Sequence, residues 1–173
     1  MPGLPGIVIG RSKNIAWGAT YTFMDTVDNW VEECQNGKFM RLSENGKTSW
    51  QHFSERTEVI KRKKHSDESV TFYENMHGVL EGDPNQAGRY LSTRWVASES
   101  GAKSLMASLK MGGAESTEQA MAYLGDIESG WNWVIADEQG DIGYQMSGLM
   151  PKRHPEWSGF TPAPGWDAAY DWQ

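Results

Sequence analysis

Two Asn-Gly pairs, each between short runs of strand-forming residues, constrain the fold of this chain more than any other feature. They occur in Gln35-Asn36-Gly37-Lys38 and in Glu44-Asn45-Gly46-Lys47. Asn-Gly is a strong signal for a two-residue β-hairpin turn, because Asn and Gly tolerate the positive φ angles that such a turn requires. The sequence therefore predicts an antiparallel meander, with strands at 27–34, 39–42, 49–53, 57–63 and 70–73.

The rest of the chain predicts further strands and two helices. Strands are expected at 4–9 and 15–20, and a hairpin at 131–136 and 142–146. The sequence does not decide the secondary structure of the segment 87–95. Apolar spacing predicts a helix over 101–111, and the capping box beginning at Ser116 predicts a second one. The fold class is therefore α+β, with antiparallel strands, a meander and a helical insertion. We describe 1–173 as a single piece, strand-rich over 1–100, helical over 101–128, and ending in a hairpin and irregular tail over 129–173.

The composition of the chain limits the classes of function that it can have. The formal net charge of -7 argues against a general nucleic-acid surface, because phosphate binding needs a basic face. The basic run 61–64 is interpreted as a solvated edge strand, where lysines discourage edge-to-edge pairing. Cys34 is the only cysteine, which excludes an internal disulfide and favours a packing role. Nine Trp and 19 Gly indicate a sheet-rich body with an aromatic-lined surface or cleft, and a carbohydrate-binding module would show the same composition.

Common catalytic motifs do not occur in the sequence. It contains no G-x-S-x-G elbow, phosphate-binding P-loop, C-x-x-C pair or H-E-x-x-H helix. The four histidines are scattered without the spacing of metal ligands, and each is interpreted as a surface or hydrogen-bonded side chain: His52, His65, His77 and His154.

Two local patterns leave alternatives open. In Asp25-Thr26-Val27-Asp28, two carboxylates and a carbonyl between them can converge on one hard cation, although an Asp pair in a loop is also typical of a turn and a solvated cap. In Trp17-Gly18-Ala19-Thr20-Tyr21, the aromatic and the glycine can line a pocket or serve as ordinary core residues.

Several co-linear motifs together resemble the penicillin acylase family of the N-terminal-nucleophile (Ntn) hydrolase superfamily, over nearly the whole chain. The resemblance is carried by the Trp17–Tyr21 and Asp25–Asp28 segments already described and by four further stretches. These are Met76-His77-Gly78-Val79-Leu80, Asn132-Trp133-Val134-Ile135-Ala136-Asp137, Gly140-Asp141-Ile142-Gly143-Tyr144 and Pro162-Ala163-Pro164-Gly165-Trp166-Asp167. In the family, they belong to the β-subunit of an αββα fold.

The resemblance implies roles for particular residues. The backbone N–H of Tyr21 would help to hold the oxyanion of an amide hydrolysis, since a fixed donor aimed at developing charge stabilises it. Acyl-binding positions of the family fall on Ile9, Ala19, Ser108 and Trp131. Asp25 and Asp28, with the carbonyl of Val27, would ligate a structural calcium ion, in a site that is incomplete within this chain. Substrates would be β-lactam side-chain amides, acyl-homoserine lactones or other N-acyl compounds.

The resemblance also implies what this chain lacks. Family β-subunits begin with a Ser that is both nucleophile and, through its α-amino group, its own base; that position precedes Pro5. The chain is therefore expected to be an internal β-subunit fragment that is inactive alone and needs the remaining α- and β-subunit segments of its precursor. A periplasmic or secreted parent follows by analogy, with no nucleic-acid or membrane partner. The alternatives are a Trp-rich module that binds carbohydrate or protein, and a calcium-dependent structural domain.

Overall fold

The computed structural model describes residues 6–43, 45–99 and 101–173, which form two compact units. The first combines the N-terminal segment up to Thr26 with Val96–Met150, and the second combines Val27–Trp95 with Pro151–Gln173. Each unit is thus assembled from two segments of chain, which differs from the single piece with three consecutive regions that the sequence predicts. Among the described residues, no helix is both long and apolar enough to cross a membrane.

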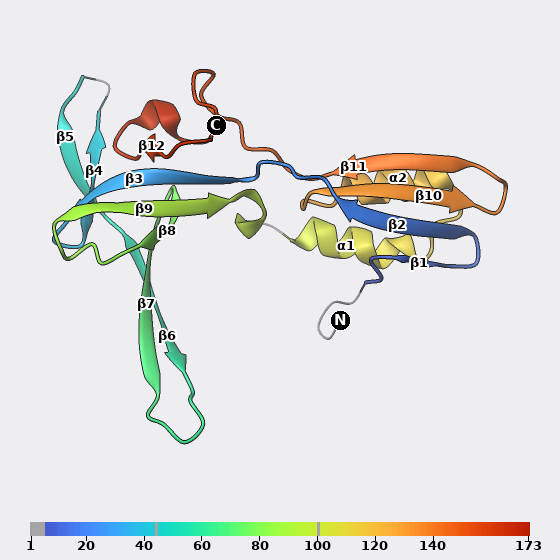
Figure 1. The fold of residues 1–173 in the computed structure, drawn as a ribbon, viewed down its shortest axis with the longest axis horizontal. Coiled ribbons are helices and arrows are strands. Elements are labelled where there is room, and N and C mark those ends of the chain that lie inside the picture. Colours follow the sequence, from blue (N-terminus) through green and yellow to red (C-terminus); the bar gives the residue numbers. More distant parts are fainter. Residues whose placement is uncertain (1–5, 44, 100) are drawn as a thin grey trace. The chain divides into compact units, whose positions relative to one another are not determined.

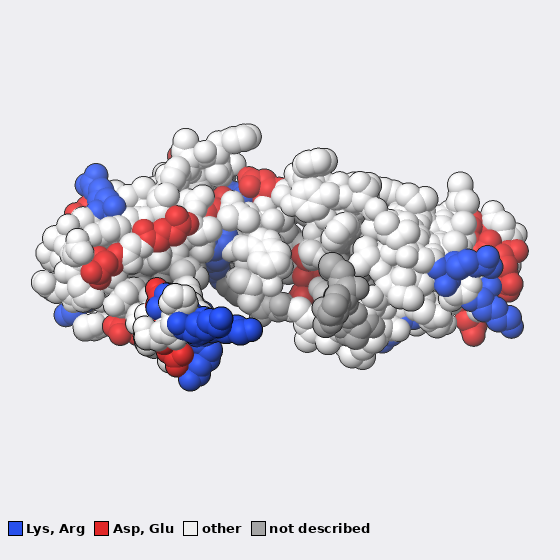
Figure 2. Space-filling view, turned by 60° about the horizontal axis from the view of Figure 1, so that its bottom comes forward, with Lys and Arg blue, Asp and Glu red and all other residues white. Residues whose placement is uncertain are grey.

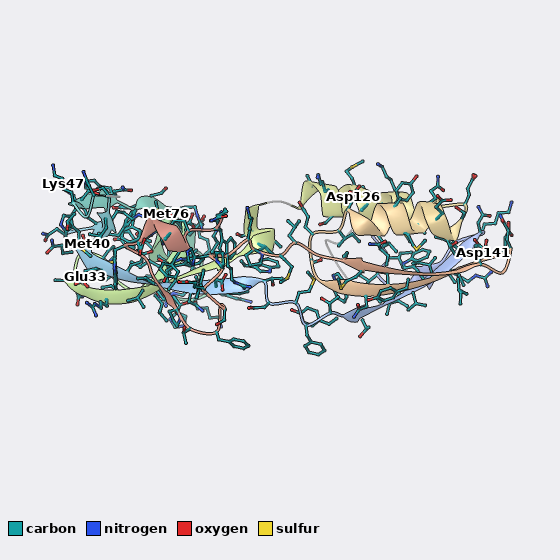
Figure 3. The ribbon with its side chains drawn as sticks, turned by 90° about the horizontal axis from the view of Figure 1, so that it is seen from above. Glu33, Met40, Lys47, Met76, Asp126 and Asp141 are labelled. Atoms are coloured by element: carbon teal, nitrogen blue, oxygen red, sulfur yellow. The ribbon has the colours of Figure 1, made fainter. Side chains whose placement is uncertain are left out.

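The first unit is a four-stranded antiparallel sheet covered by two helices (Figure 1). The strand order is β1-β2-β10-β11. Both helices lie on the same face of the sheet, which Figure 3 shows from above, with Asp126 just after the end of α2 and Asp141 at the turn of the β10–β11 hairpin. The elements are β1 (Gly10–Arg11), β2 (Ile15–Tyr21), η1 (Val96–Glu99), α1 (Ala102–Met111), α2 (Thr117–Gly125), β10 (Trp131–Asp137) and β11 (Ile142–Ser147).

The core of the first unit lies between this sheet and the helices. Trp17 and Ile15 of β2 and Trp133 and Ile135 of β10 are buried against apolar residues of both helices. Alternate residues of a strand face one side of a sheet, so these four face the helices together. Helix α2 begins as predicted: the side chain of Ser116 accepts a hydrogen bond from the N–H of Gln119 at 3.2 Å.

The second unit is built on an eight-stranded sheet with a strand order of β5-β4-β3-β9-β8-β7-β6, and β12 pairs with β3 off this path. The consecutive strands β5 and β6 lie at opposite ends of the order, and buried Phe53 between them packs against Phe39 and Tyr73. Its elements are β3 (Val27–Gln35), β4 (Lys38–Leu42), β5 (Thr48–His52), β6 (Ser54–Ile60), β7 (Glu68–Asn75), β8 (Gly78–Glu81), β9 (Gly88–Trp95), β12 (Ala163–Pro164) and η2 (Ala168–Tyr170).

The sequence predictions agree with the structure in most local details. The α+β class, the meander and both helices are confirmed, and Asn36 and Gly37 adopt φ angles of 52° and 73° between β3 and β4. The segment 87–95, whose secondary structure the sequence does not decide, contains the strand β9. The strand expected at 4–9 is wrong over residues 6–9, because pairing starts only at Gly10; residues 4 and 5 lie outside the described part. The strand expected at 57–63 is β6, which ends at Ile60.

Candidate functional site

A cavity of about 330 Å³ opens in the first unit between α1 and the sheet. Apolar side chains form most of its wall, and serines of α1 and of the loop before β10 add hydroxyl groups. The lining residues are Val8, Gly101, Ser104, Leu105, Ser108, Ile127, Ser129, Trp131 and Trp133. Ligand cavities are typically apolar with a few polar groups that orient the ligand. This cavity fits an apolar chain or ring that carries few polar atoms.

Hydrogen bonds fix the polar part of this wall. The Oγ of Ser104 donates to Oε2 of Glu128 at 3.1 Å and accepts from the N–H of Glu128 at 2.9 Å. Glu128 is 7% exposed, so Ser104 partners a nearly buried carboxylate at the edge of the cavity. The indole N–H of Trp131 donates to Oγ of Ser129 at 2.9 Å. These bonds hold the loop before β10 against α1.

The structure brings together two of the four predicted acyl-binding residues. Ser108 and Trp131 line the cavity. Ile9 is 65% exposed, and Ala19 packs against the core of the first unit; neither is among the lining residues of this cavity. Sequence reasoning missed Ser104 and Leu105, although Ser104 lies one helical turn before Ser108 and this spacing places both on one face of α1.

Tyr21 is the last residue of β2 and faces Trp131 of β10. The two aromatic rings meet edge to face, with centroids 6.3 Å apart, so Tyr21 lies beside the cavity wall. Hydrogen bonding alternates along an antiparallel pair. In the β2–β10 register, the N–H of Glu138 donates to the carbonyl of Asn14, and the carbonyl of Ile15 instead accepts from Ser12, on the β1 side. By this alternation the N–H of Tyr21 also points away from β10, along an edge that β1 covers only at Ala16 and Trp17 in the described residues.

The three residues of the predicted calcium site divide between the two units. Asp25 is exposed and belongs to the first unit, near the end of its N-terminal segment, whereas Val27 and Asp28 are the first two residues of the second unit. Asp28 is fully buried, and its Oδ2 accepts from Nε of Arg153 and from the indole N–H of Trp172, both at 2.7 Å. Its Oδ1 has no hydrogen-bond partner among the described residues. One buried oxygen of Asp28 thus fits a cation ligand, while the described residues contain no group of three acidic, His or Cys side chains able to hold a metal.

A separate polar cluster lies buried in the second unit. His77 is fully buried and stacks on Trp30, with ring centroids 4.6 Å apart at an interplanar angle of 9°. Its ring nitrogens contact Glu32 at 2.6 Å and Asp171 at 2.8 Å, and Arg41 forms a bidentate pair with Asp171. The prediction that His77 is hydrogen-bonded is confirmed. With no exposure to solvent, His77 holds the fold together rather than meeting a substrate.

The tryptophans do not form an exposed row. All nine are described, and only Trp95 is exposed, at 46%. Four are buried in the cores of the two units, and the other four are half-buried. A carbohydrate-binding surface needs exposed aromatic faces, so the distribution does not favour the binding-module alternative.

Comparison with known proteins covers the whole chain. The family model described as Penicillin amidase matches residues 1–173. Acyl-homoserine lactone acylase QuiP of Pseudomonas aeruginosa is 32% identical over 98% of this chain, which spans 21% of that protein. Penicillin G acylase of Escherichia coli is 30% identical over 98% of the chain, which spans 20% of its length.

A solved structure confirms the fold. Thermostable penicillin G acylase from Alcaligenes faecalis superposes with a TM-score of 0.84 and 24% identity, covering 99% of this chain and 30% of that one. The chain therefore corresponds to about a fifth of the curated relatives it matches. Given a family model that matches from the first residue to the last, this chain belongs to the penicillin amidase family.

Proposed function

We propose that the protein to which this chain belongs hydrolyses linear N-acyl amides, and that the chain supplies the acyl pocket and one oxyanion donor. Family membership and relatives named as acylases support the reaction class. The observation that carries the proposal is the cavity beside α1, because it is lined by Ser108 and Trp131, two of the residues to which the resemblance assigns acyl binding.

The chemistry of the cavity supports an apolar acyl group. Its walls come from Val8, Leu105, Ile127 and two tryptophans, and burial of a methylene group there stabilises a complex by about 0.8 kcal/mol. The indole of Trp131 lines the cavity and contacts the ring of Tyr21 edge to face. A bulky side chain in the wall limits the size of the acyl group that can be bound.

The Tyr21 amide supports the same reaction. A backbone N–H that is fixed by a sheet and not used by the neighbouring strand can donate to a developing oxyanion without reorganisation. The attacking nucleophile, and a second hydrogen-bond donor to the oxyanion, are proposed to lie on polypeptide outside this chain. The chain alone is accordingly proposed to be inactive.

We also propose that Asp25, Asp28 and the carbonyl of Val27 contribute oxygens to a structural calcium ion. The unpartnered, buried Oδ1 of Asp28 supports this, because a buried carboxylate oxygen without a donor is costly unless a cation or water satisfies it. Arg153 already balances part of the charge of Asp28, so the remaining ligands would have to come from the rest of the protein. Calcium would order the chain and take no part in the hydrolysis.

The reaction is tested on the full-length protein with acyl-homoserine lactones of several chain lengths and with phenylacetyl and fatty acyl amides. We expect hydrolysis of at least one class. Trp131→Ala should raise the relative kcat/KM for the larger acyl groups by about 10-fold or more, as expected when a pocket gains room. Tyr21→Pro should lower kcat by about 10²–10³, the usual effect of removing one oxyanion donor, whereas Tyr21→Phe should leave it unchanged.

Two results would contradict the proposal. If the full-length protein cleaves none of these amides, the reaction class is wrong. If Tyr21→Phe and Tyr21→Pro lower kcat equally, the side chain of Tyr21 matters and its amide does not. For calcium, calorimetric titration of the full-length protein should show binding that Asp28→Asn weakens; absence of heat in the wild type would exclude the ion.

A further inference from the structure

Strand β6 leaves a long edge of the second unit's sheet open. It ends the strand order and pairs only with β7 among the described residues. All seven of its residues are exposed, and the β6–β7 hairpin projects away from the other strands of its unit (Figure 1). Such an edge presents unpaired N–H and C=O groups and is a template for another strand.

The order of charges along β6 suits pairing with itself. When a strand pairs antiparallel with its own copy, the two-fold axis passes through one residue, which then lies opposite itself. With the axis at Thr57, Arg56 faces Glu58 of the second copy, and Glu58 faces Arg56 of that copy. Opposite charges at directly facing positions stabilise a strand pair.

No other antiparallel register of β6 with itself is as favourable. An axis at Glu55, Arg56 or Glu58 places a charged residue opposite its own copy, and like charges at facing positions are destabilising. An axis at Ser54, Val59 or Ile60 leaves most of the strand unpaired. Thr57 is therefore the one centre in β6 that combines a long overlap with complementary charges.

The basic end of the hairpin sets the direction of pairing. Lysine and arginine gather where this hairpin comes forward in Figure 2, at residues 61–64 directly after β6. A parallel pair would place the two basic ends side by side, whereas an antiparallel pair places them at opposite ends of the joint sheet.

The existing contacts of Arg56 allow this rearrangement. Arg56 contacts Glu58 at 2.6 Å and Glu74 at 3.4 Å within its own chain, and all three side chains are more than a third exposed. Exposed ion pairs contribute little to stability, so Arg56 can share Glu58 of a second copy with little loss.

We propose that the β6 edge is a self-association surface, on which a second copy of this protein adds its own β6, antiparallel and centred on Thr57. The two sheets then become continuous across the axis. The inference is independent of the acylase activity, since it uses none of the residues around the cavity.

The test measures the mass of the full-length protein in solution by sedimentation velocity over a range of concentrations. The wild type should form a dimer that weakens with added salt. In Arg56→Glu, both facing pairs consist of two glutamates, and in Glu58→Arg both consist of two arginines. Because like charges repel, each variant alone should lose the dimer. An equal mixture of the two variants should regain it, because both facing pairs then join opposite charges. Lys63→Glu, a charge reversal outside the paired residues, should leave the dimer unchanged.

Each other outcome overturns the proposal. A wild-type protein that stays monomeric throughout shows that the edge is open or covered by another part of the same protein. Single variants that dimerise as the wild type does, or a mixture that stays monomeric, show that β6 does not pair in this register. Circular dichroism of each variant verifies that the exposed substitutions leave the fold intact.

Discussion

The Nδ1 atom of His77 lies 2.6 Å from Oε1 of Glu32, with both side chains fully buried. Its Nε2 atom lies 2.8 Å from Oδ1 of Asp171. An ionised carboxylate only accepts hydrogen bonds, so a charged imidazole that donates from both ring nitrogens satisfies both contacts. Together with Arg41, which also binds Asp171, these side chains join β3, β4, the turn after β7 and the C-terminal segment.

The first prediction concerns pH. Burial disfavours the charged imidazole, but the hydrogen bonds to Asp171 and Glu32 outweigh it and raise the pKa of His77 above its ordinary value of 6.5. The contribution of His77 to stability is therefore fully present below the unfolded pKa, and it is lost as the pH rises through the higher pKa of the folded state. Urea unfolding of the full-length protein at several pH values should show this loss of stability. Tryptophan fluorescence, to which Trp30 contributes, is the readout.

The control is His77→Gln, which cannot titrate. This variant should be less stable than the wild type at low pH, by about 3–5 kcal/mol if it behaves like other broken buried charge pairs. The difference between the two proteins should shrink as the pH rises. Equal pH dependence in both would mean that His77 is neutral in the folded state.

The second prediction concerns the space beside Glu32. Gly165 packs so closely against this carboxylate that a Cβ at position 165 would overlap Oε2 and lie 2.9 Å from Oε1. Gly165→Ala should therefore destabilise the protein by about 1–3 kcal/mol, the usual effect of overpacking a core. A Cβ at Gly112 would meet nothing within 4 Å, so Gly112→Ala is the matched control. Thermal unfolding of both variants measures the difference, and equal melting temperatures would contradict the prediction.

The third prediction concerns the single cysteine. Burial, with the nearby charges of Glu32 and Glu33, raises the pKa of the Cys34 thiol to about 12. Because the thiolate is the reactive form, Cys34 should resist a thiol reagent at neutral pH in the folded protein and react fully in denaturant. Fast labelling of Cys34 in the native state would show that the second unit opens locally.

Local signals in the sequence predicted local structure well. The Asn36-Gly37 turn and the Ser116 cap depend on residues within one turn of each other, so the sequence contains all the information they need. The pairing of β2 with β10 was not predictable in the same way, because it joins segments more than a hundred residues apart, such as Tyr21 and Trp131.

The candidate site was predictable only in part for the same reason. The family resemblance supplied Ser108 and Trp131, but the remaining cavity wall depends on how α1 packs over the sheet. The His77 cluster was also missed, since Arg41 and Asp171 lie 130 positions apart in the chain and nothing in their local sequences links them. Tertiary packing, and not local preference, brings these groups together.

The fourth prediction separates two serines that line the same cavity. Ser104→Ala removes both the donor to the nearly buried carboxylate of Glu128 and the acceptor for its N–H. Leaving such groups without partners costs about 1–3 kcal/mol, and it frees the loop that carries Ile127 and Ser129 into the cavity wall. Ser108→Ala is the control, because the Oγ of Ser108 donates only to the carbonyl of Ser104, which is also an acceptor for the backbone hydrogen bonds of the helix. Denaturant unfolding should show a clear loss for Ser104→Ala and a small one for Ser108→Ala; equal losses would mean that Glu128 finds another partner and that Ser104 does not hold the wall.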